Sequence, residues 1–155
     1  MAAHDTRIIA AVDGSEGAGR AAAAAANLAK SMNRPLTLLY VFAAPGPNEF
    51  VSLDNVSGAL IDPARLSEEG MNAAKKEAAK KAFAAARQAI GGNDVQIEEQ
   101  VVSGRPVQAI LDFAGKSDAA IVVVGRRGLG KVGEMLLGSV SNKLVHQTRV
   151  PVMVV

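Results

Sequence analysis

The sequence predicts an α/β protein with an open sheet of five parallel strands that is covered by helices on both faces. Two observations predict this fold. Apolar, strand-like runs alternate along the chain with longer helix-like segments, and the run AAIVVV at residues 119–124 is apolar throughout. Such alternation is typical of parallel sheets, whose central strands are buried on both faces. The 155 residues suit a single domain, 1–155, without an internal boundary.

The first half of the chain is expected to supply two strands and two helices. The apolar run at 7–12 stops at an Asp-Gly-Ser turn, and an alanine-rich helix follows at 16–32. A second strand at 35–41 leads into a long, irregular and variable loop at 43–64. A second helix is expected at 66–90. Its predicted packing face consists of Met71, Ala74, Ala78, Ala82, Ala85 and Ala89.

The second half is expected to supply the other three strands. A more polar strand at 95–102 is predicted near a sheet edge, and Pro106 suits the first turn of the helix at 107–116. The remaining elements are a strand at 119–124, a helix from 139 to about 147 and a strand at 150–155. Ligands of such sheets bind outside the carboxyl ends of the strands. The strand ends to consider are 13–15, 41, 103–104 and 125–128.

Composition excludes several kinds of protein. The chain has no cysteine, which excludes disulfides and thiolate metal sites. Its two histidines and scattered carboxylates show no metal-site spacing, so we expect no metal site built from side chains. Neither a secretory signal nor an apolar segment of membrane-spanning length is apparent. We therefore expect a cytoplasmic protein without a membrane partner.

Positive charge gathers near the C-terminal end of the sequence. The net charge of +2 is too small to indicate nucleic acid as a partner, and we expect none. Residues 1–124 carry 12 basic and 14 acidic side chains, whereas residues 125–155 carry five basic and one acidic, a net charge of +4. Two interpretations stay open at this point, namely a site for a small anion and a solvated basic surface.

Three phosphate-binding motifs overlap in the stretch VVVGRRGLGKVGEMLLGS at residues 122–139. A P-loop would be incomplete, because Val132 stands where a Ser or Thr hydroxyl would contact magnesium. A dinucleotide fingerprint that starts at Gly128 lacks the acidic residue expected about 20 residues further on. The remaining pattern is wider, with Gly-x-x-Gly, nine residues and then Gly-Ser.

This wider pattern fits the predicted layout best. Gly125 and Gly128 close a strand, where a missing side chain would let a ligand approach the backbone. Gly138 and Ser139 open a helix, whose free N–H groups and positive dipole end suit an anion, and Ser141 adds a hydroxyl. A phosphate held between the two glycine pairs is one interpretation. A flexible loop punctuated by glycines is the other.

These residues resemble the universal stress protein family, which is marked by Gly-x-x-Gly, nine residues, then Gly-Ser or Gly-Thr. The other similar segments are VDGSE at 12–16, Gly104-x-Pro106, SDAAIVVVG at 117–125 and GSVSNKLVHQTRVPVMVV at 138–155. The resemblance covers the chain except the loop at about 43–64. It implies the same Rossmann-like sheet of five parallel strands, and it places the chain with the members that bind ATP.

By this resemblance the expected cofactor is ATP, with or without Mg²⁺, and another adenine nucleotide, including a cyclic one, is compatible. Asp13 would accept hydrogen bonds from the ribose hydroxyls, and Ala11, Val12 and Val41 would border the adenine and the sugar. The residues expected along the phosphates are Gly125, Arg127, Gly128, Gly138, Ser139, Val140 and Ser141. The sequence does not determine whether Arg127 or its neighbour Arg126 faces the ligand.

The resemblance also implies a homodimer that pairs through the C-terminal strand, with Val150, Val152 and Val154 at the contact. An unpaired strand of this composition would be an exposed apolar edge, so a partner also makes physical sense. We expect a module of the stress response in which nucleotide occupancy regulates conformation or the choice of an unidentified protein partner.

Two alternatives remain beside this expectation. One is an enzyme that slowly hydrolyses ATP or transfers an adenylyl group. We identify no catalytic residue, because no base or water-orienting group is evident, and so expect at most a slow ATPase. The other alternative is a nucleotide-free dimer that acts through protein contacts.

Overall fold

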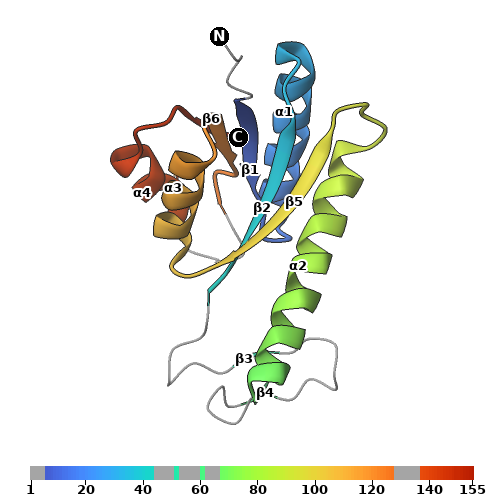
Figure 1. Cartoon of the computed structure of the whole chain (residues 1–155), viewed down its shortest axis with the longest axis vertical. Coiled ribbons are helices and arrows are strands. Elements are labelled where there is room, and N and C mark those ends of the chain that lie inside the picture. Colours follow the sequence, from blue (N-terminus) through green and yellow to red (C-terminus); the bar gives the residue numbers. More distant parts are fainter. Residues whose placement is uncertain (1–5, 44–50, 53–59, 62–66, 128–136) are drawn as a thin grey trace.

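The computed structural model describes residues 6–43, 51–52, 60–61, 67–127 and 137–155. Five strands form one parallel sheet in the order β5-β2-β1-β6-β7 (Figure 1). The strands are β1 (Arg7–Ala11), β2 (Leu36–Phe42), β5 (Ile97–Ser103), β6 (Ala119–Val124) and β7 (Val152–Val154). The helices are α1 (Glu16–Met32), α2 (Glu68–Ile90), α3 (Pro106–Lys116) and α4 (Ser139–Gln147). The predicted α/β fold with an open five-stranded parallel sheet is therefore confirmed.

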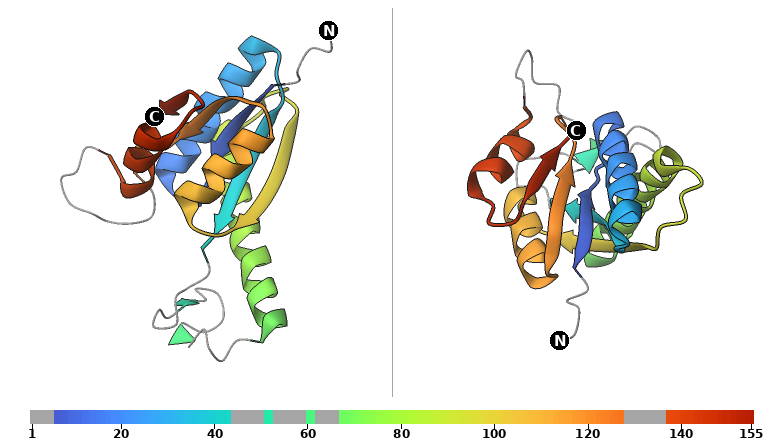
Figure 2. Two further views of the ribbon diagram at one scale, coloured as in Figure 1. Left: turned by 60° about the vertical axis from the view of Figure 1, so that its left-hand side comes forward. Right: turned by 90° about the horizontal axis from the view of Figure 1, so that it is seen from above.

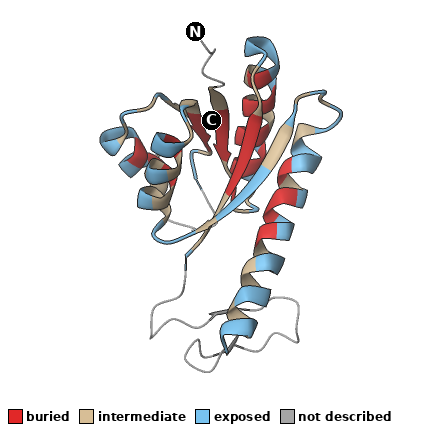
Figure 3. Ribbon diagram, in the orientation of Figure 1, coloured by how far each residue is buried: buried red, intermediate tan, exposed pale blue. Residues whose placement is uncertain are grey.

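Helices cover both faces of the sheet (Figure 2). α1 and α2 pack on one face and on each other, whereas α3 and α4 lie on the opposite face. The central strand β1 contributes to both cores, because Ile8 and Ala10 face α1 and α2 while Ile9 faces α3 and α4. Figure 3 shows the resulting burial of the central strands. Cover on both faces explains why β6 is apolar throughout and why β1 and β2 are largely apolar.

Small side chains allow α1 to lie close to its neighbours. Ser15 caps its N-terminus by accepting a hydrogen bond from the N–H of Ala18 at 3.1 Å. The buried face consists of Gly17, Ala18, Gly19, Ala21, Ala22, Ala25, Ala26 and Ala29. A Cβ atom at Gly19 would lie 3.3 Å from the Cβ of Ala89 in α2. The high alanine content of the sequence therefore reflects close packing of α1 between the sheet and α2.

The predicted packing face of α2 is shifted from the observed one. Met71, Ala74, Ala78 and Ala85 are partly buried, and Ala89, although exposed, lies against Gly19 of α1. The structure buries Ala79, Ala82, Phe83 and Ala86, so only Ala82 of the predicted set lies in the core. Phe83 explains the difference, because its ring meets the ring of Tyr40 edge-on with centroids 6.4 Å apart, and a buried aromatic ring removes more apolar surface from water than alanine does. The first half of α2 runs past the sheet (Figure 1), and none of its residues 68–78, all described, is buried.

The loop predicted at 43–64 contains more regular structure than expected. β3 (Val51–Ser52) and β4 (Leu60–Ile61) pair in antiparallel orientation. Residues 44–50, 53–59 and 62–64 of this loop lie outside the described residues. Neither two-residue segment is long enough to produce an alternating pattern in the sequence.

The two outer strands of the sheet are β5 and β7. The edge position predicted for the polar strand β5 is confirmed. β7 is shorter than the predicted strand at 150–155, because a turn precedes it. In this turn the Oγ1 atom of Thr148 accepts a hydrogen bond from the N–H of Val150 at 2.9 Å and donates one to the carbonyl oxygen of Val150 at 2.6 Å.

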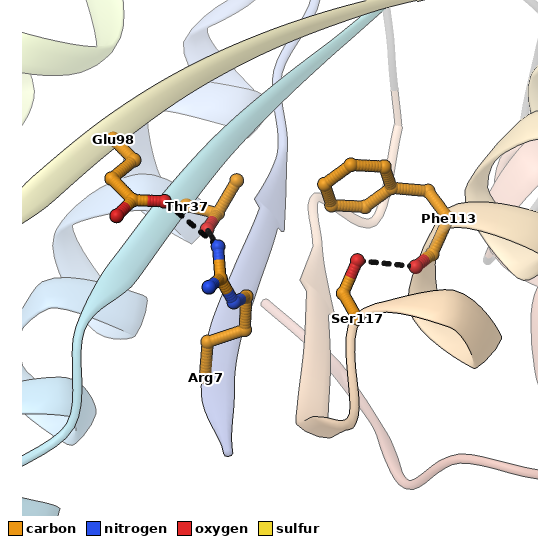
Figure 4. A network of polar contacts seen from close by, with 5 residues as sticks. All are labelled: Arg7, Thr37, Glu98, Phe113 and Ser117. Carbon is orange, nitrogen blue, oxygen red and sulfur yellow. Dashed lines mark hydrogen bonds and ion pairs between the residues drawn. The ribbon is translucent and has the colours of Figure 1, made fainter. Parts of the chain in front are cut away.

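Polar contacts tie the amino ends of three strands together (Figure 4). The Nη1 atom of Arg7 donates to Oε2 of Glu98 at 2.8 Å and to Oγ1 of Thr37 at 3.3 Å, which joins β1, β2 and β5. Nearby, the hydroxyl of Ser117 donates to the carbonyl oxygen of Phe113 at 2.6 Å at the end of α3. These contacts stabilise the amino-terminal edge of the sheet. The candidate site lies at the opposite edge.

Candidate functional site

A cavity of about 360 Å³ lies at the carboxyl ends of β1, β2 and β6. This is where ligands bind in open parallel sheets. Its volume falls at the small end of the range of ligand cavities, roughly 300–1,000 Å³. Its described lining consists of Ala11, Val12, Asp13, Ser15, Ala18, Leu39, Val41, Pro106, Ile110, Val124, Gly125, Arg127, Leu137, Gly138, Ser139, Val140 and Ser141.

The residues selected from the sequence lie together at this cavity. Ten of the eleven line it, and they are Ala11, Val12, Asp13, Val41, Gly125, Arg127, Gly138, Ser139, Val140 and Ser141. The eleventh, Gly128, lies outside the described residues.

Sequence reasoning missed seven residues of the lining. They are Ser15, Ala18, Leu39, Pro106, Ile110, Val124 and Leu137. Pro106 carried a signal that was not used, because it starts a helix directly after β5 and so belongs to the same edge of the sheet. Leu39 and Ile110 carried none, since an apolar residue in a strand or helix does not reveal whether it faces the core or a cavity.

The turn at 125–127 holds α4 and the last strand to the end of β6. The N–H of Gly138 donates to the carbonyl oxygen of Arg126 at 2.7 Å, and the hydroxyl of Ser141 lies 3.0 Å from the same oxygen. The N–H of Arg126 donates to a carbonyl oxygen of Val155, after β7, at 2.8 Å. One short turn therefore positions both the first turn of α4 and the end of β7.

Gly125 packs against α1. A Cβ atom at Gly125 would lie 2.7 Å from the carbonyl carbon of Gly17 and 2.8 Å from its carbonyl oxygen. From the other side, a Cβ atom at Gly17 would lie 2.6 Å from the carbonyl oxygen of Arg127. Backbone atoms thus exclude side chains at both positions. Packing against α1 therefore requires a glycine at position 125 even without a ligand, and the same residue lines the cavity.

The N-terminus of α4 borders the cavity. Its N-cap is Gly138, which has no side chain to accept a hydrogen bond, whereas Ser15 caps α1. The first N–H groups of a helix have no partner within the helix, and the helix dipole favours negative charge there. The start of α4 can therefore bind an anion through its backbone.

Ser141 holds the start of α4 in place. It is 3% exposed, and its hydroxyl lies 3.0 Å from the carbonyl oxygen of Arg126 and 3.1 Å from that of Gly138. A serine hydroxyl has one proton, and in this structure it is directed at these carbonyl groups. Ser141 could donate to a ligand only after this proton turned away from them.

Asp13 follows the central strand β1 and is half-buried. Its Oδ1 atom accepts a hydrogen bond from the N–H of Ser15 at 2.9 Å, which orients the carboxylate at the start of α1. Burial raises the pKa of Tyr40, and the nearby negative charge of Asp13 raises it further. The cavity thus combines a carboxylate acceptor after β1 with a basic residue, Arg127, after β6.

The structure distinguishes the two adjacent arginines. Arg126 and Arg127 are both exposed. Arg127 is part of the described cavity lining, and Arg126 is not. Of the two arginines, Arg127 is therefore the one that lies at the cavity.

Asp13 is the one carboxylate, and no histidine is present, in the described lining of the cavity. Within the described ranges, no group of three or more His, Asp or Glu residues is placed to hold a metal ion. Across the same residues, no helix combines the length and the apolar composition needed to cross a membrane.

Comparisons with known proteins identify the family. The profile described as the universal stress protein family matches residues 6–155. Universal stress protein YxiE of Bacillus subtilis is 32% identical over 149 residues, which cover 96% of this chain and 97% of the relative. Universal stress protein UspA from Lactobacillus plantarum has a TM-score of 0.74 at 24% identity, with 99% of each chain covered. A universal stress protein solved in complex with cAMP has a TM-score of 0.58 at 28% identity, with 97% of this chain and 96% of that chain covered. This chain belongs to the universal stress protein family.

Proposed function

We propose that this chain is a binding module that holds an adenine nucleotide, with ATP as the first candidate, in the cavity at the carboxyl ends of the strands. One observation carries the proposal: the described residues of the glycine motif surround the same cavity as Asp13 and Arg127. The relative solved with cAMP supports an adenine nucleotide as the ligand class. In this proposal, binding of the nucleotide in the cavity regulates the conformation or the protein contacts of a cytoplasmic homodimer in the stress response.

The lining offers an apolar part and an anion-binding part. Ala11, Val12 and Val41 present apolar surface that suits an adenine ring and a sugar. The carboxylate of Asp13 accepts hydrogen bonds, as ribose hydroxyls require. The N-terminus of α4, which has no side-chain cap, and the guanidinium of Arg127 suit phosphates. Mg²⁺ in this proposal arrives with the nucleotide and is held chiefly by the phosphates.

The proposal is binding rather than rapid catalysis. ATP hydrolysis needs a group that orients or deprotonates water near the terminal phosphate. Asp13 is the one carboxylate in the described lining, and it already accepts a hydrogen bond from Ser15. The alternative, a slow ATPase or adenylyl transferase, predicts product that accumulates at about one turnover per minute or faster. Recovery of intact ATP after incubation with the protein would contradict that alternative.

A pair of variants in α4 tests the site. Ser139 is exposed and lines the cavity, whereas Asn142 is exposed in the same helix and lies outside the described lining. Ser139→Glu and Asn142→Glu add the same charge, which the dipole tolerates near the start of a helix. We expect Mg-ATP to raise the melting temperature of the wild type and of Asn142→Glu, because a ligand selective for the folded state stabilises it. Ser139→Glu should show no rise, because its carboxylate repels the phosphates.

Each outcome has a distinct meaning. A rise in Ser139→Glu equal to that of the wild type would contradict the assigned phosphate position. No rise in the wild type with ATP, ADP, AMP or cAMP would contradict nucleotide binding and favour the nucleotide-free dimer. Gly138→Val is unsuitable as a test, since a Cβ atom there would lie 3.2 Å from the carbonyl oxygen of Arg126 and disturb the turn without any ligand.

We also propose that β7 pairs with β7 of a second copy. Val152 and Val154 lie in this outer strand and are partly buried, and Val150 lies in the turn before it. The carbonyl of Pro151 and the N–H of Val155 bond to β6, so the N–H groups of Val152 and Val154 face the open edge.

Val154→Pro tests this pairing, with Val154→Ala as the control. Proline removes the N–H that faces the open edge but none that bonds to β6. Light scattering should show a dimer for the wild type and for Val154→Ala, and a monomer for Val154→Pro. A dimer in all three proteins would contradict pairing through β7.

A further inference from the structure

We propose that Arg127 is the residue by which the cavity selects highly charged nucleotides, ATP and ADP, over AMP, a cyclic nucleotide or adenosine. This inference rests on the proposed nucleotide site and concerns its specificity. Two positions carry it: Arg127 lines the cavity, and its neighbour Arg126, of equal charge, is outside the described lining.

Two elements hold the backbone of Arg127. Its carbonyl oxygen lies against α1, where a Cβ atom at Gly17 would approach it to 2.6 Å. Its Cα lies beside the start of α4, 3.4 Å from the position of a Cβ atom at Gly138. The side chain therefore begins at a defined point next to the N-terminus of α4. This is the part of the cavity that the proposed function assigns to the phosphates.

A guanidinium at this point responds to the charge of the ligand. Arginine stays ionised at physiological pH, and its planar fork of donors matches two phosphate oxygens. Its attraction to a ligand increases with the number of negative charges on that ligand, and uncharged adenosine offers no charge to attract. Because Arg127 is exposed, salt weakens this attraction, so the selectivity should be greatest at low ionic strength.

Arg126 provides a matched control one position away. It has the same charge and is also exposed. Its N–H donates to Val155 and its carbonyl oxygen accepts from Gly138, and these backbone bonds do not depend on its side chain. An effect of net charge alone should therefore be similar for changes at Arg126 and Arg127. A contact with phosphate should appear at Arg127 only.

The test compares the wild type with Arg127→Gln, Arg127→Lys and Arg126→Gln by calorimetric titration with ATP, ADP, AMP, cAMP and adenosine at low and high salt. The wild type should bind ATP more tightly than AMP, and AMP more tightly than adenosine. Arg127→Gln should weaken ATP binding about tenfold at low salt, as expected for a charge-assisted hydrogen bond partly screened by water, and leave adenosine binding unchanged. Arg127→Lys keeps the charge and should recover part of the preference. Arg126→Gln should keep the wild-type order.

Two results would overturn the inference. The first is an equal ratio of ATP to adenosine affinity in the wild type and in Arg127→Gln; if the ligand-free variant also melts at a lower temperature, the role of Arg127 is structural. The second is an equal loss of ATP affinity in Arg126→Gln. Failure of the wild type to bind any of the five ligands would overturn the proposed nucleotide site itself, and the inference with it.

Discussion

Replacing Gly125 by alanine perturbs the close contact between the end of β6 and α1. The new Cβ atom would lie 2.7 Å and 2.8 Å from the carbonyl carbon and oxygen of Gly17, and 3.1 Å from the backbone nitrogen of Ala18. All three are backbone atoms, so the contact can relax only if α1 or the turn moves. Overpacking of this kind costs about 1–3 kcal/mol. Alanine offsets part of this by restricting the unfolded chain, by about 0.4–1 kcal/mol.

The expected net effect is a loss of about 1–2 kcal/mol of unfolding free energy. For a chain of this length, each kcal/mol lowers the melting temperature by about 2–4 °C. Urea unfolding followed by circular dichroism measures the free energy. Gly115→Ala is the matched control, because the added Cβ meets no atom within 4 Å apart from its chain neighbours and the nearby backbone of its own helix, and alanine is the better residue in a helix. The control should be as stable as the wild type or more so.

A double variant tests whether the two glycines form one contact. Gly17→Ala inserts a Cβ atom into the same contact from the α1 side, 2.6 Å from the carbonyl oxygen of Arg127. If α1 and the turn separate to accept one methyl group, the second should cost less. Gly17→Ala with Gly125→Ala should then cost less than the two single changes together. Wild-type stability of Gly125→Ala, or strict additivity of the two changes, would refute this account of the contact.

Three further predictions concern polar groups. Ser141→Ala should lower the free energy of unfolding in urea by only about 1 kcal/mol, because the carbonyl oxygen of Arg126 still accepts a hydrogen bond from the Gly138 N–H at 2.7 Å. A loss below the error of the measurement would contradict a role for the hydroxyl. Glu98→Gln removes the ion pair between Glu98 and Arg7, whose side chains are 39% and 26% exposed respectively. The free energy of unfolding should fall by less than about 1 kcal/mol, and this difference should vanish at high salt. A larger loss that salt does not change would contradict this. Tyr40 is the single tyrosine, so tyrosinate absorbance should titrate above pH 10.0 in the folded protein. Its protonated form stabilises the fold below pH 10.0, and this contribution is lost as pH rises through the raised pKa; titration at or below pH 10.0 would contradict it.

Local patterns in the sequence were sufficient to predict most elements. The structure has α1 at Glu16–Met32, β6 at Ala119–Val124 and α4 at Ser139–Gln147, as predicted. Each of these begins or ends at a local signal, such as the Ser15 cap, the apolar run AAIVVV or the Gly-Ser pair. Such signals act over a few residues and so can be recognised without knowing the fold.

The orientation of α2 could not be predicted in this way. Its alanines occur on several sides, so the periodicity of the sequence favours no face strongly. The decisive residue is Phe83, which packs edge-on against Tyr40, a residue of β2 that is distant in the sequence. The sheet beneath the helix thus determines its orientation, which explains why the predicted face included Ala82 but not Ala79, Phe83 and Ala86.

In the candidate site, too, some features could be predicted from the sequence and others depended on the tertiary structure. The types of residue and their spacing in the sequence were enough to select Asp13 and the glycine motif, because strand ends of a parallel sheet meet at one edge. Only the tertiary structure decided that Arg127 rather than Arg126 borders the cavity, and that Gly125 packs against Gly17. The physical reason is that periodicity, caps and strand ends depend on neighbouring residues, whereas the direction of a side chain and the room for a Cβ atom depend on backbone segments that only folding brings together.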